Sequence, residues 1–287
     1  MAYPEQINLP FNYAAIKDDF VFHHQTALPD DAPAGYWAII QGGNIVVNRK
    51  KSETRYTLPE GALPDWLVPA KPPVTVGMWH GKPLRAFTIS RDIRLADNWM
   101  AEPFNAGANI LDMQTLTLGG IAKQVLHWLS RSRFCARCGT ANEPIYGTWG
   151  KRCPACAAQH FPHLHPCAIV LVKRAKEVLL TRKAEWAPGR YSLVAGFLDF
   201  GESLEECAIR EVQEETGISI RNVRYVGSQN WPFPAQLMAG FTADYESGDI
   251  VVDHHELEDA RWFHVDALPD LPLARSISRH IIDTYAV

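Results

Sequence analysis

The sequence has no excess of positive charge, no long apolar run and few cysteines. Its 287 residues contain 28 Lys and Arg against 32 Asp and Glu, a formal net charge of -4, whereas proteins that bind nucleic acids non-specifically usually carry a basic excess. No apolar run approaches the roughly 18 residues that a membrane-spanning helix needs. The first residues, MAYPEQINLPF, lack the basic and apolar segments of a secretory signal. We therefore expect a cytoplasmic globular protein with no membrane partner.

Four of the six cysteines form two CxxC pairs separated by 14 residues. Two thiolates at CxxC spacing can share one zinc ion, and four thiolates close its tetrahedral shell, which leaves no position for water or substrate. Disulfides are disfavoured in a reducing compartment, and a redox pair is disfavoured because the motif is duplicated. The sequence therefore predicts a structural zinc site, with those two readings as alternatives. The predicted zinc ligands are Cys135, Cys138, Cys153 and Cys156.

The remaining cysteines and a cluster of histidines carry weaker signals. Cys167 and Cys207 lie in apolar stretches and are expected to be small core residues. Three histidines stand close together in HFPHLH, residues 160–165, and we expect surface or partly buried side chains there. A second metal site is the alternative, because His163 and His165 have the alternate spacing that converges on one face of a strand.

The N-terminal part of the chain predicts a β-rich domain without clustered catalytic residue types. Strand-like runs span residues 36–47, 52–58 and 74–89, and glycine and proline clusters interrupt them. A helix is expected over residues 120–131, where apolar residues recur at helical spacing. It leads directly into the cysteine pairs.

Most of the candidate functional side chains lie on a predicted acidic helix of about 13 residues. This helix follows a buried strand and a glycine-containing loop. Ser203 followed by Glu206 is a capping-box signature for its beginning. Gly217 is a natural left-handed residue just after its last turn. The sequence therefore brackets this helix at both ends.

Two glutamates of the helix, Glu211 and Glu215, continue the apolar stripe that begins at Leu204. Like charges one turn apart repel each other and burial raises the cost, so a cation should lie beside them. Arg210 and Glu214 are spaced to pair along the helix, which leaves the other two glutamates for a metal ion. Ligand sets made only of oxygen favour Mg²⁺ or Mn²⁺. A solvated acidic face without metal is the alternative.

With these residues in place, the sequence resembles the Nudix hydrolases. It matches all nine fixed positions of the Nudix box, Gx5Ex7REUxEExGU, in which U is an aliphatic residue. The resemblance implies an α/β fold, an α/β/α sandwich with a mixed sheet, and hydrolysis of a nucleoside diphosphate linked to another group. It also implies that glutamates of this helix hold divalent cations. The matched positions are Gly196, Glu202, Arg210, Glu211, Val212, Glu214, Glu215, Gly217 and Ile218.

A second motif narrows the resemblance to the NADH pyrophosphatase branch of this family. Residues 228–236, SQNWPFPAQ, share six of the eight specified positions of that branch's SQPWPFPxS signature. Asn230 replaces a proline, which is expected to loosen the loop because a fixed φ is lost, and Gln236 replaces a serine. The branch also carries a four-cysteine zinc ribbon. The resemblance therefore implies a diverged N-terminal domain at 1–119, a helix and zinc ribbon at 120–160, and a Nudix catalytic domain at 161–287.

The resemblance implies a divalent-metal site that extends beyond the helix. Glu211, Glu214 and Glu215 are expected to hold Mg²⁺ or Mn²⁺, with Glu214 either a ligand or the group that positions the attacking water. The backbone carbonyl of Ala195 and the carboxylate of Glu256 would complete the site. The expected catalytic residues are Arg210, Glu211, Glu214 and Glu215.

The resemblance also implies a stacking site for the dinucleotide. Phe197 matches an aromatic residue that stacks on the nicotinamide ring, and Phe161 stands where relatives have a tyrosine that covers the other face through a homodimer. For Trp231 and Phe233, a loop plug without substrate contact is the alternative. The expected substrate-binding residues are Phe161, Phe197, Gln229, Asn230, Trp231, Pro232, Phe233, Pro234, Ala235, Gln236 and Ser278.

The resemblance implies metal-dependent hydrolysis of the pyrophosphate bond of NADH or NAD⁺, which gives NMNH or NMN and AMP. Two alternatives stay open. One is removal of the NAD cap from RNA 5′ ends, in which the same bond is cut on a larger substrate. The other is a zinc-ribbon binding module that recognises a nucleotide without turnover.

Overall fold

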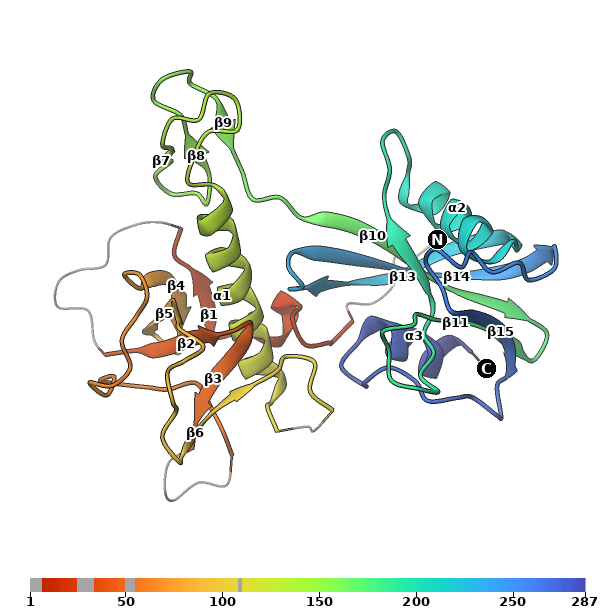
Figure 1. Cartoon of the computed structure of the whole chain (residues 1–287), viewed down its shortest axis with the longest axis horizontal. Coiled ribbons are helices and arrows are strands. Elements are labelled where there is room, and N and C mark those ends of the chain that lie inside the picture. The colour runs from red at the N-terminus through yellow and green to blue at the C-terminus, as the bar shows by residue number, and fades with distance from the viewer. Residues whose placement is uncertain (1–6, 25–33, 50–54, 108–109, 287) are drawn as a thin grey trace. The chain divides into compact units, whose positions relative to one another are not determined.

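The computed structural model describes residues 7–24, 34–49, 55–107 and 110–286, and the chain forms two compact units (Figure 1). The C-terminal unit consists of Leu164–Trp231 and Gln236–Val287 together with the segment Met1–Pro10. The N-terminal unit consists of Phe11–His163 together with the loop Pro232–Ala235. Each unit has its own sheet, and none of the described helices is long and apolar enough to span a bilayer.

The C-terminal unit is a mixed six-stranded sheet whose main path runs β13-β14-β10-β11-β15, with β12 beside β10. Strands β10 and β14 run parallel, and the other described pairs are antiparallel. The strands are β10 (His165–Arg174), β11 (Glu177–Arg182), β12 (Val194–Phe197), β13 (Ser219–Trp231), β14 (Gln236–Ser247) and β15 (Asp259–His264).

The two helices of this unit, α2 (Leu204–Thr216) and α3 (Ile277–Tyr285), cover opposite faces of the sheet. The alternation of side chains along β10 produces this division. Ala168, Val170 and Val172 pack in the core beneath α2, whereas Ile169 and Leu171 pack in the core beneath α3. The continuous apolar run of β10 is therefore buried on both sides, and the predicted α/β/α sandwich is confirmed.

Helix α2 begins and ends where the sequence predicts. The Ser203 hydroxyl accepts a hydrogen bond from the Glu206 amide at 3.2 Å, and the Glu206 carboxylate accepts one from the Ser203 amide at 2.7 Å. At the other end Gly217 has a φ of 72°, and its amide donates to the Gln213 carbonyl. The caps fix the rotation of the helix, so Glu211 and Glu215 are buried as the helical wheel predicts.

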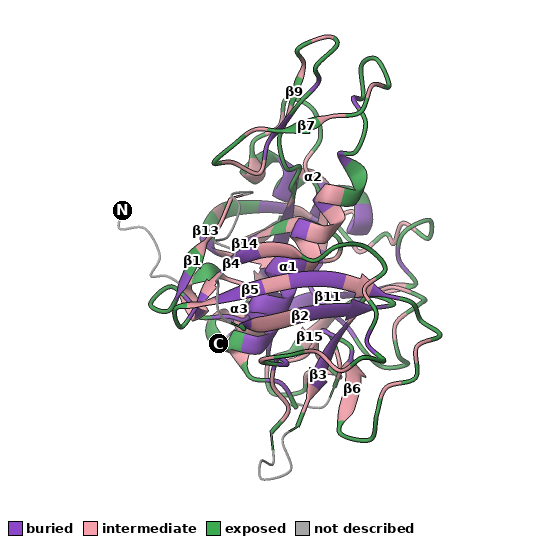
Figure 2. Ribbon diagram, turned by 90° about the vertical axis from the view of Figure 1, so that its left-hand side faces the viewer, coloured by how far each residue is buried: buried purple, intermediate pink, exposed green. Residues whose placement is uncertain are grey.

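The N-terminal unit contains a six-stranded sheet in the order β1-β4-β5-β2-β3-β6, with β2 and β5 parallel. Its central strands are largely buried (Figure 2). The β-rich expectation is confirmed. The elements are η1 (Tyr13–Ala15), β1 (Phe20–Phe22), β2 (Tyr36–Gln41), β3 (Asn44–Asn48), β4 (Val74–Trp79), β5 (Lys82–Ile89), β6 (Trp99–Glu102) and α1 (Met113–Arg131).

Two of the three predicted strand runs in this unit form hairpins, β2–β3 and β4–β5. The third run, at 52–58, lies partly outside the described residues. Of the rest of that run, Thr57 forms an isolated bridge with Asn48.

Helix α1 begins seven residues before the predicted start, at Met113, and the expected domain boundary at residue 119 falls inside it. Asp112 caps the helix by accepting a hydrogen bond from the Thr115 amide at 2.7 Å. The apolar spacing places the start at residue 120, but Gly119 and Gly120 lie in the helix interior, where the packing is tight. A Cβ at Gly119 would lie 2.4 Å from Ile45 Cδ1, so only glycine allows this approach to the sheet.

The two units share one strand order. The path β4-β5-β2-β3-β6 repeats β13-β14-β10-β11-β15, and the parallel pair occupies the same place in both. In the C-terminal unit the acidic helix α2 precedes β13. The corresponding strand of the N-terminal unit is β4. The connection from β3 to β4 contains no helix in its described residues, 49 and 55–73. Over its described residues, the N-terminal sheet therefore repeats the topology with no counterpart of the glutamate-bearing helix.

A small three-stranded sheet follows α1 and is formed by β7 (Glu143–Pro144), β8 (Lys151–Arg152) and β9 (Gln159–His160). Its strands have only two residues each, too few for a hydrophobic core of their own. The cysteine pairs flank these strands, so a metal ion is the expected source of stability.

The capping box predicts the effect of a single substitution. Ser203→Ala leaves the Glu206 amide without its acceptor and should lower the free energy of unfolding by about 1 kcal/mol. Urea unfolding followed by circular dichroism measures the change. Ser247→Ala, at an exposed position at the end of β14, is the matched control and should change stability by less than about 0.5 kcal/mol. Equal effects of the two substitutions would contradict the capping assignment.

Candidate functional site

Arg210 organises the acidic surface of α2. Its guanidinium donates to Glu202 at 2.9 Å, to Glu211 at 2.8 Å and to Glu214 at 2.9 Å. It also donates to the carbonyl of Phe197 at 2.9 Å, which ties the helix to the end of β12. The hydrogen bonds from Arg210 hold the pKa of Glu202 down at about 2, so that carboxylate stays ionised.

The predicted pair of Arg210 with Glu214 is confirmed, but the expectation that Glu211 is free of this pair is wrong. One guanidinium nitrogen, Nη1, reaches both carboxylates because Glu211 follows Arg210 directly and the nitrogen lies between them. Glu214 is the more exposed partner, so its side chain can leave the arginine at lower cost than Glu211. Arg210 thus positions Glu211 rather than leaving it unpaired.

The carboxylate of Glu211 occupies space that only a glycine can leave open. A Cβ at Gly196 would lie 1.9 Å from Glu211 Cδ and 2.1 Å from each carboxylate oxygen. Burial raises the pKa of Glu211, against the lowering effect of Arg210. The glycine of the Nudix box on β12 therefore makes room for a carboxylate in a largely dry position.

Among the described residues, Glu215 is the acidic group whose buried carboxylate oxygens have no hydrogen-bond partner. It is only 2% exposed. Burial raises the pKa of Glu215 to about 8, and Lys183 offsets this only in part. A buried carboxylate without partners is costly unless a cation binds it. The oxygen-only chemistry of this group and its neighbours fits Mg²⁺ or Mn²⁺.

Two further predicted ligands lie on neighbouring elements of the same unit. Glu256 is exposed in the turn before β15, and its negative charge contributes to raising the pKa of both Glu211 and Glu215. Ala195 lies on β12 opposite Ile169 of β10. Helix α2, strand β12 and the turn before β15 thus supply the predicted divalent-metal ligands. Sequence reasoning missed Lys183, whose charge acts on Glu215 from the end of β11.

The aromatic residues predicted to stack on substrate are half exposed. Phe197 is 54% exposed and meets His165 edge to face, with 6.3 Å between the ring centroids. Phe161 is 49% exposed and belongs to the N-terminal unit, where its ring lies against Gly150. Both rings have a free surface, and their role in binding stays a prediction.

Gln229 has a structural position within the C-terminal unit. Its side-chain amide is buried and donates to the carbonyls of Pro10 and Arg275 at 2.9 and 2.8 Å. Its carbonyl oxygen accepts from the Ile277 amide at 2.8 Å, at the first residue of α3. The side chain of Gln229 thus bonds to Pro10, Arg275 and Ile277 of the protein itself. It therefore holds the start of α3 and the N-terminal segment in place.

The expectation that Asn230 loosens the loop is wrong. Asn230 lies in β13 and pairs with Leu237 of β14, so the ladder restrains its backbone where proline would have restrained φ. The connection itself is the four-residue loop Pro232–Ala235, between Trp231 at the end of β13 and Gln236 at the start of β14.

Phe233 packs within the N-terminal unit. Its ring meets Phe11 and Phe104 edge to face, with centroid distances of 6.0 and 6.2 Å. The ammonium of Lys123 lies 4.2 Å from its centroid, a cation–π contact. These contacts favour the loop-plug alternative for Phe233. They leave the binding role of the surrounding residues, Trp231 to Gln236, as a prediction.

Ser278 is buried on α3, and its hydroxyl lies 2.8 Å from that of Ser192. Cys167 and Cys207 are buried core residues, as predicted. The alternative histidine metal site is not formed among the described residues, because His163 meets the ring of Trp128 and His165 meets Phe197.

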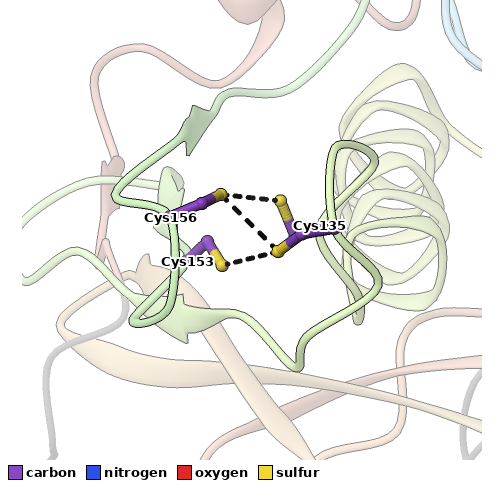
Figure 3. A group of neighbouring side chains, drawn as sticks. Cys135, Cys153 and Cys156 are labelled. Carbon is purple, nitrogen blue, oxygen red and sulfur yellow. Dashed lines mark hydrogen bonds between the residues drawn. The ribbon is translucent and has the colours of Figure 1, made fainter.

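The four cysteines of the CxxC pairs converge on one point (Figure 3). Their sulfur atoms all lie within 4.8 Å of one another, and the close pairs are 3.4 to 3.6 Å apart. A disulfide needs about 2.05 Å, whereas two thiolates on a tetrahedral zinc ion lie about 3.8 Å apart. All four are free thiols, so the disulfide alternative is excluded and the geometry is that of a closed zinc site.

The two halves of this site have the same backbone turn. Cys135 and Cys153 each accept a hydrogen bond from the amide four residues ahead, and each donates to the carbonyl five residues ahead. The residue after the second cysteine of each pair is left-handed, Gly139 at φ 75° and Ala157 at φ 59°. Sequence reasoning also missed His160, whose Nε2 lies 3.3 Å from Cys135 Sγ and can donate to a zinc-bound thiolate.

The closed thiolate cluster predicts about one zinc ion per chain by elemental analysis. Cys153→Ser should lose that zinc and lower the unfolding temperature, because the short strands have no other core. Cys167→Ala removes a cysteine outside the cluster and should keep its zinc. A Cys153→Ser protein with unchanged zinc content and unfolding temperature would contradict the assignment.

Comparison with known protein families accounts for most of the chain. Residues 163–285 match the NUDIX domain, and residues 34–128 match the NADH pyrophosphatase-like rudimentary NUDIX domain. Residues 130–161 match the NADH pyrophosphatase zinc ribbon domain. The second match agrees with the strand order that the two units share.

Individual relatives extend over most of the chain. The NAD-capped RNA hydrolase NudC of Pseudomonas aeruginosa is 45% identical over 210 residues, 73% of this chain and 75% of that protein. The protein of the same name from Stutzerimonas stutzeri is 39% identical over 91% of this chain and 93% of its own length. A solved NUDIX hydrolase from Nitrosomonas europaea has a TM-score of 0.46 and 24% identity over 54% of this chain and 90% of that one. The box on α2, the zinc ribbon and the full-length relatives agree, and the chain belongs to the NudC branch of the Nudix hydrolase family.

Proposed function

We propose that this protein hydrolyses the pyrophosphate bond of NADH and NAD⁺, giving NMNH or NMN and AMP, with Mg²⁺ or Mn²⁺ as cofactor. The observation that carries the proposal is Glu215, a buried carboxylate with no protein partner on the Nudix helix. The matched NADH pyrophosphatase-like and zinc ribbon domains support the substrate class.

The proposed metal ligands are Glu211, Glu215, Glu256 and the carbonyl of Ala195. A bound divalent cation would neutralise charge on the phosphoryl oxygens and lower the pKa of water. Arg210 is a positioning residue in this scheme, because it holds Glu211 and fastens the helix to β12. Glu214 is exposed and shares Arg210, so it is the group placed to orient the attacking water or to serve as a further ligand.

The proposed dinucleotide site uses the half-exposed ring of Phe197 for stacking. Phe161 would cover the other face of the ring in a homodimer. We also propose that Trp231, Gln236 and Ser278 of the C-terminal unit contact the dinucleotide. We also propose a cytoplasmic location, because cysteines that are not in disulfides are typical of a reducing compartment.

The names of the relatives favour a second substrate. They are called NAD-capped RNA hydrolases, so we propose that the chain also removes the NAD cap from RNA 5′ ends. The same pyrophosphate bond is cut in both substrates, and the same glutamates serve. A binding module without turnover is disfavoured, because every acidic position of the Nudix box is present.

Incubation with NADH and Mg²⁺ or Mn²⁺ tests the activity directly. Chromatography should show NMNH and AMP, and Glu215→Gln should lower kcat by about 100-fold or more. Glu205→Gln is the matched control, since Glu205 is an exposed glutamate on the same helix. Full activity of Glu215→Gln, or no cleavage by the parent protein, would rule out the proposal.

The raised pKa of Glu215 predicts how metal binding depends on pH. Without metal, the folded protein holds a proton on Glu215 between its ordinary pKa of 4.5 and about 8, so the stability that this proton contributes is lost as pH rises through about 8. Metal displaces the proton, so Mg²⁺ affinity should rise with pH up to about 8. Calorimetric titration with Mg²⁺ at several pH values measures this. An affinity that falls over the same range would contradict the assignment.

A further inference from the structure

The zinc ribbon, residues 130–161, differs in charge from the rest of the chain. It contains five cationic side chains and one acidic side chain, Glu143, so it carries +4 while the whole chain carries -4. A zinc ion with four thiolates adds two negative charges, which leaves the ribbon positive and the remainder at -8. The net negative charge of the whole chain therefore coexists with a net positive charge on the zinc ribbon. The cations are Arg131, Arg133, Arg137, Lys151 and Arg152.

None of these cations forms an ion pair within 4.0 Å among the described residues, although Arg152 lies opposite Glu143 where β7 pairs with β8. Elsewhere, arginines and lysines form close ion pairs, as Arg174 does with Glu177 and Arg279 with Asp283. In the ribbon the guanidinium groups are exposed, and Lys151 is only 9% exposed yet donates to no described group. The positive charge of Arg133 acts on Lys151, so these two cations are neighbours. Two neighbouring cations without a close counter-charge favour an anionic ligand.

An exposed aromatic ring lies beside these cations. Phe134 is 56% exposed, and the guanidinium of Arg133 lies over its ring, 5.3 Å from the centroid. The backbone there is rigid, because Phe134 bridges to Ala141 and the Asn142 amide donates to the Arg133 carbonyl. The zinc knuckle therefore holds a ring and two cations together before any ligand arrives, which lowers the entropy cost of binding.

We propose that Arg133, Phe134 and Lys151 bind single-stranded RNA, with the cations on the phosphates and Phe134 stacked on a base. This combination of positive charge and an exposed ring recognises single-stranded nucleic acid without a sequence code. An acidic protein segment would use the charges but would leave the ring without a base to stack on. The assignment of the RNA as the chain that follows an NAD cap rests on the proposed function.

Direct binding tests the surface without any need for catalysis. A fluorescein-labelled, uncapped single strand of about 20 nucleotides should bind the full-length protein, as followed by anisotropy. Phe134→Ala should weaken binding by about tenfold, and Arg133→Gln should weaken it and reduce the salt slope by about one. Arg221→Gln, at an exposed site on β13, removes the same charge elsewhere and should have little effect. Zinc content verifies that each variant keeps its ribbon.

Equal binding by the parent protein and both ribbon variants would overturn the proposal, as would no binding at all. Polyglutamate, a stand-in for an acidic protein, should compete weakly. Competition as strong as that of RNA, with no effect of Phe134→Ala, would also overturn it and would assign the surface to an acidic protein partner.

Hydrolysis separates this inference from the proposed function. With NADH, Arg133→Gln and Phe134→Ala should match the parent, whereas with NAD-capped RNA their kcat/KM should fall by about tenfold. If the parent cleaves neither substrate but binds RNA through the ribbon, the proposed function fails and the surface stands. If the parent cleaves both substrates and the variants match it on both, the surface is wrong and the proposed function stands.

Discussion

Glu215 is a buried carboxylate without a protein partner, and the rest of the C-terminal unit is arranged around that constraint. Burial raises the pKa of this carboxyl to about 8, so Glu215 is protonated at neutral pH unless a cation takes the place of the proton. Strand β12 supplies a glycine that makes room for the neighbouring Glu211, and Arg210 fastens the helix to that strand. The caps of α2 fix its rotation, which turns both glutamates toward the sheet.

The zinc cluster and the proposed divalent-metal site differ in their ligand chemistry. The four cysteines form a closed set that leaves no position for water, so zinc there stabilises a ribbon whose strands are too short to stabilise themselves. The carboxylates on α2 offer hard oxygen ligands, which suit Mg²⁺ or Mn²⁺ rather than zinc. The N-terminal unit has the same strand order, and its described part has no glutamate-bearing helix between β3 and β4, so the topology alone does not provide these carboxylates.

Sequence reasoning predicts the local structure well where the signals are local. A capping box, a terminal glycine and the helical period together locate Glu211 and Glu215 on the buried stripe, and CxxC spacing identifies the zinc ligands. It fails where distant segments decide the outcome. The predicted start of α1 is seven residues late; the Asp112 cap that begins the helix is local, but the packing of Gly119 against Ile45 joins segments far apart in the chain. For the same reason Asn230 was placed in a loop, although its partner Leu237 keeps it in a strand.

The most direct test of the account is anomalous diffraction from a crystal of the full-length protein soaked in Mn²⁺. The account predicts a manganese peak within coordination distance of a Glu215 oxygen, about 2.2 Å, and no such peak in Glu215→Gln. A parent crystal in which both Glu215 oxygens bind only protein groups and manganese is absent from α2 would contradict it.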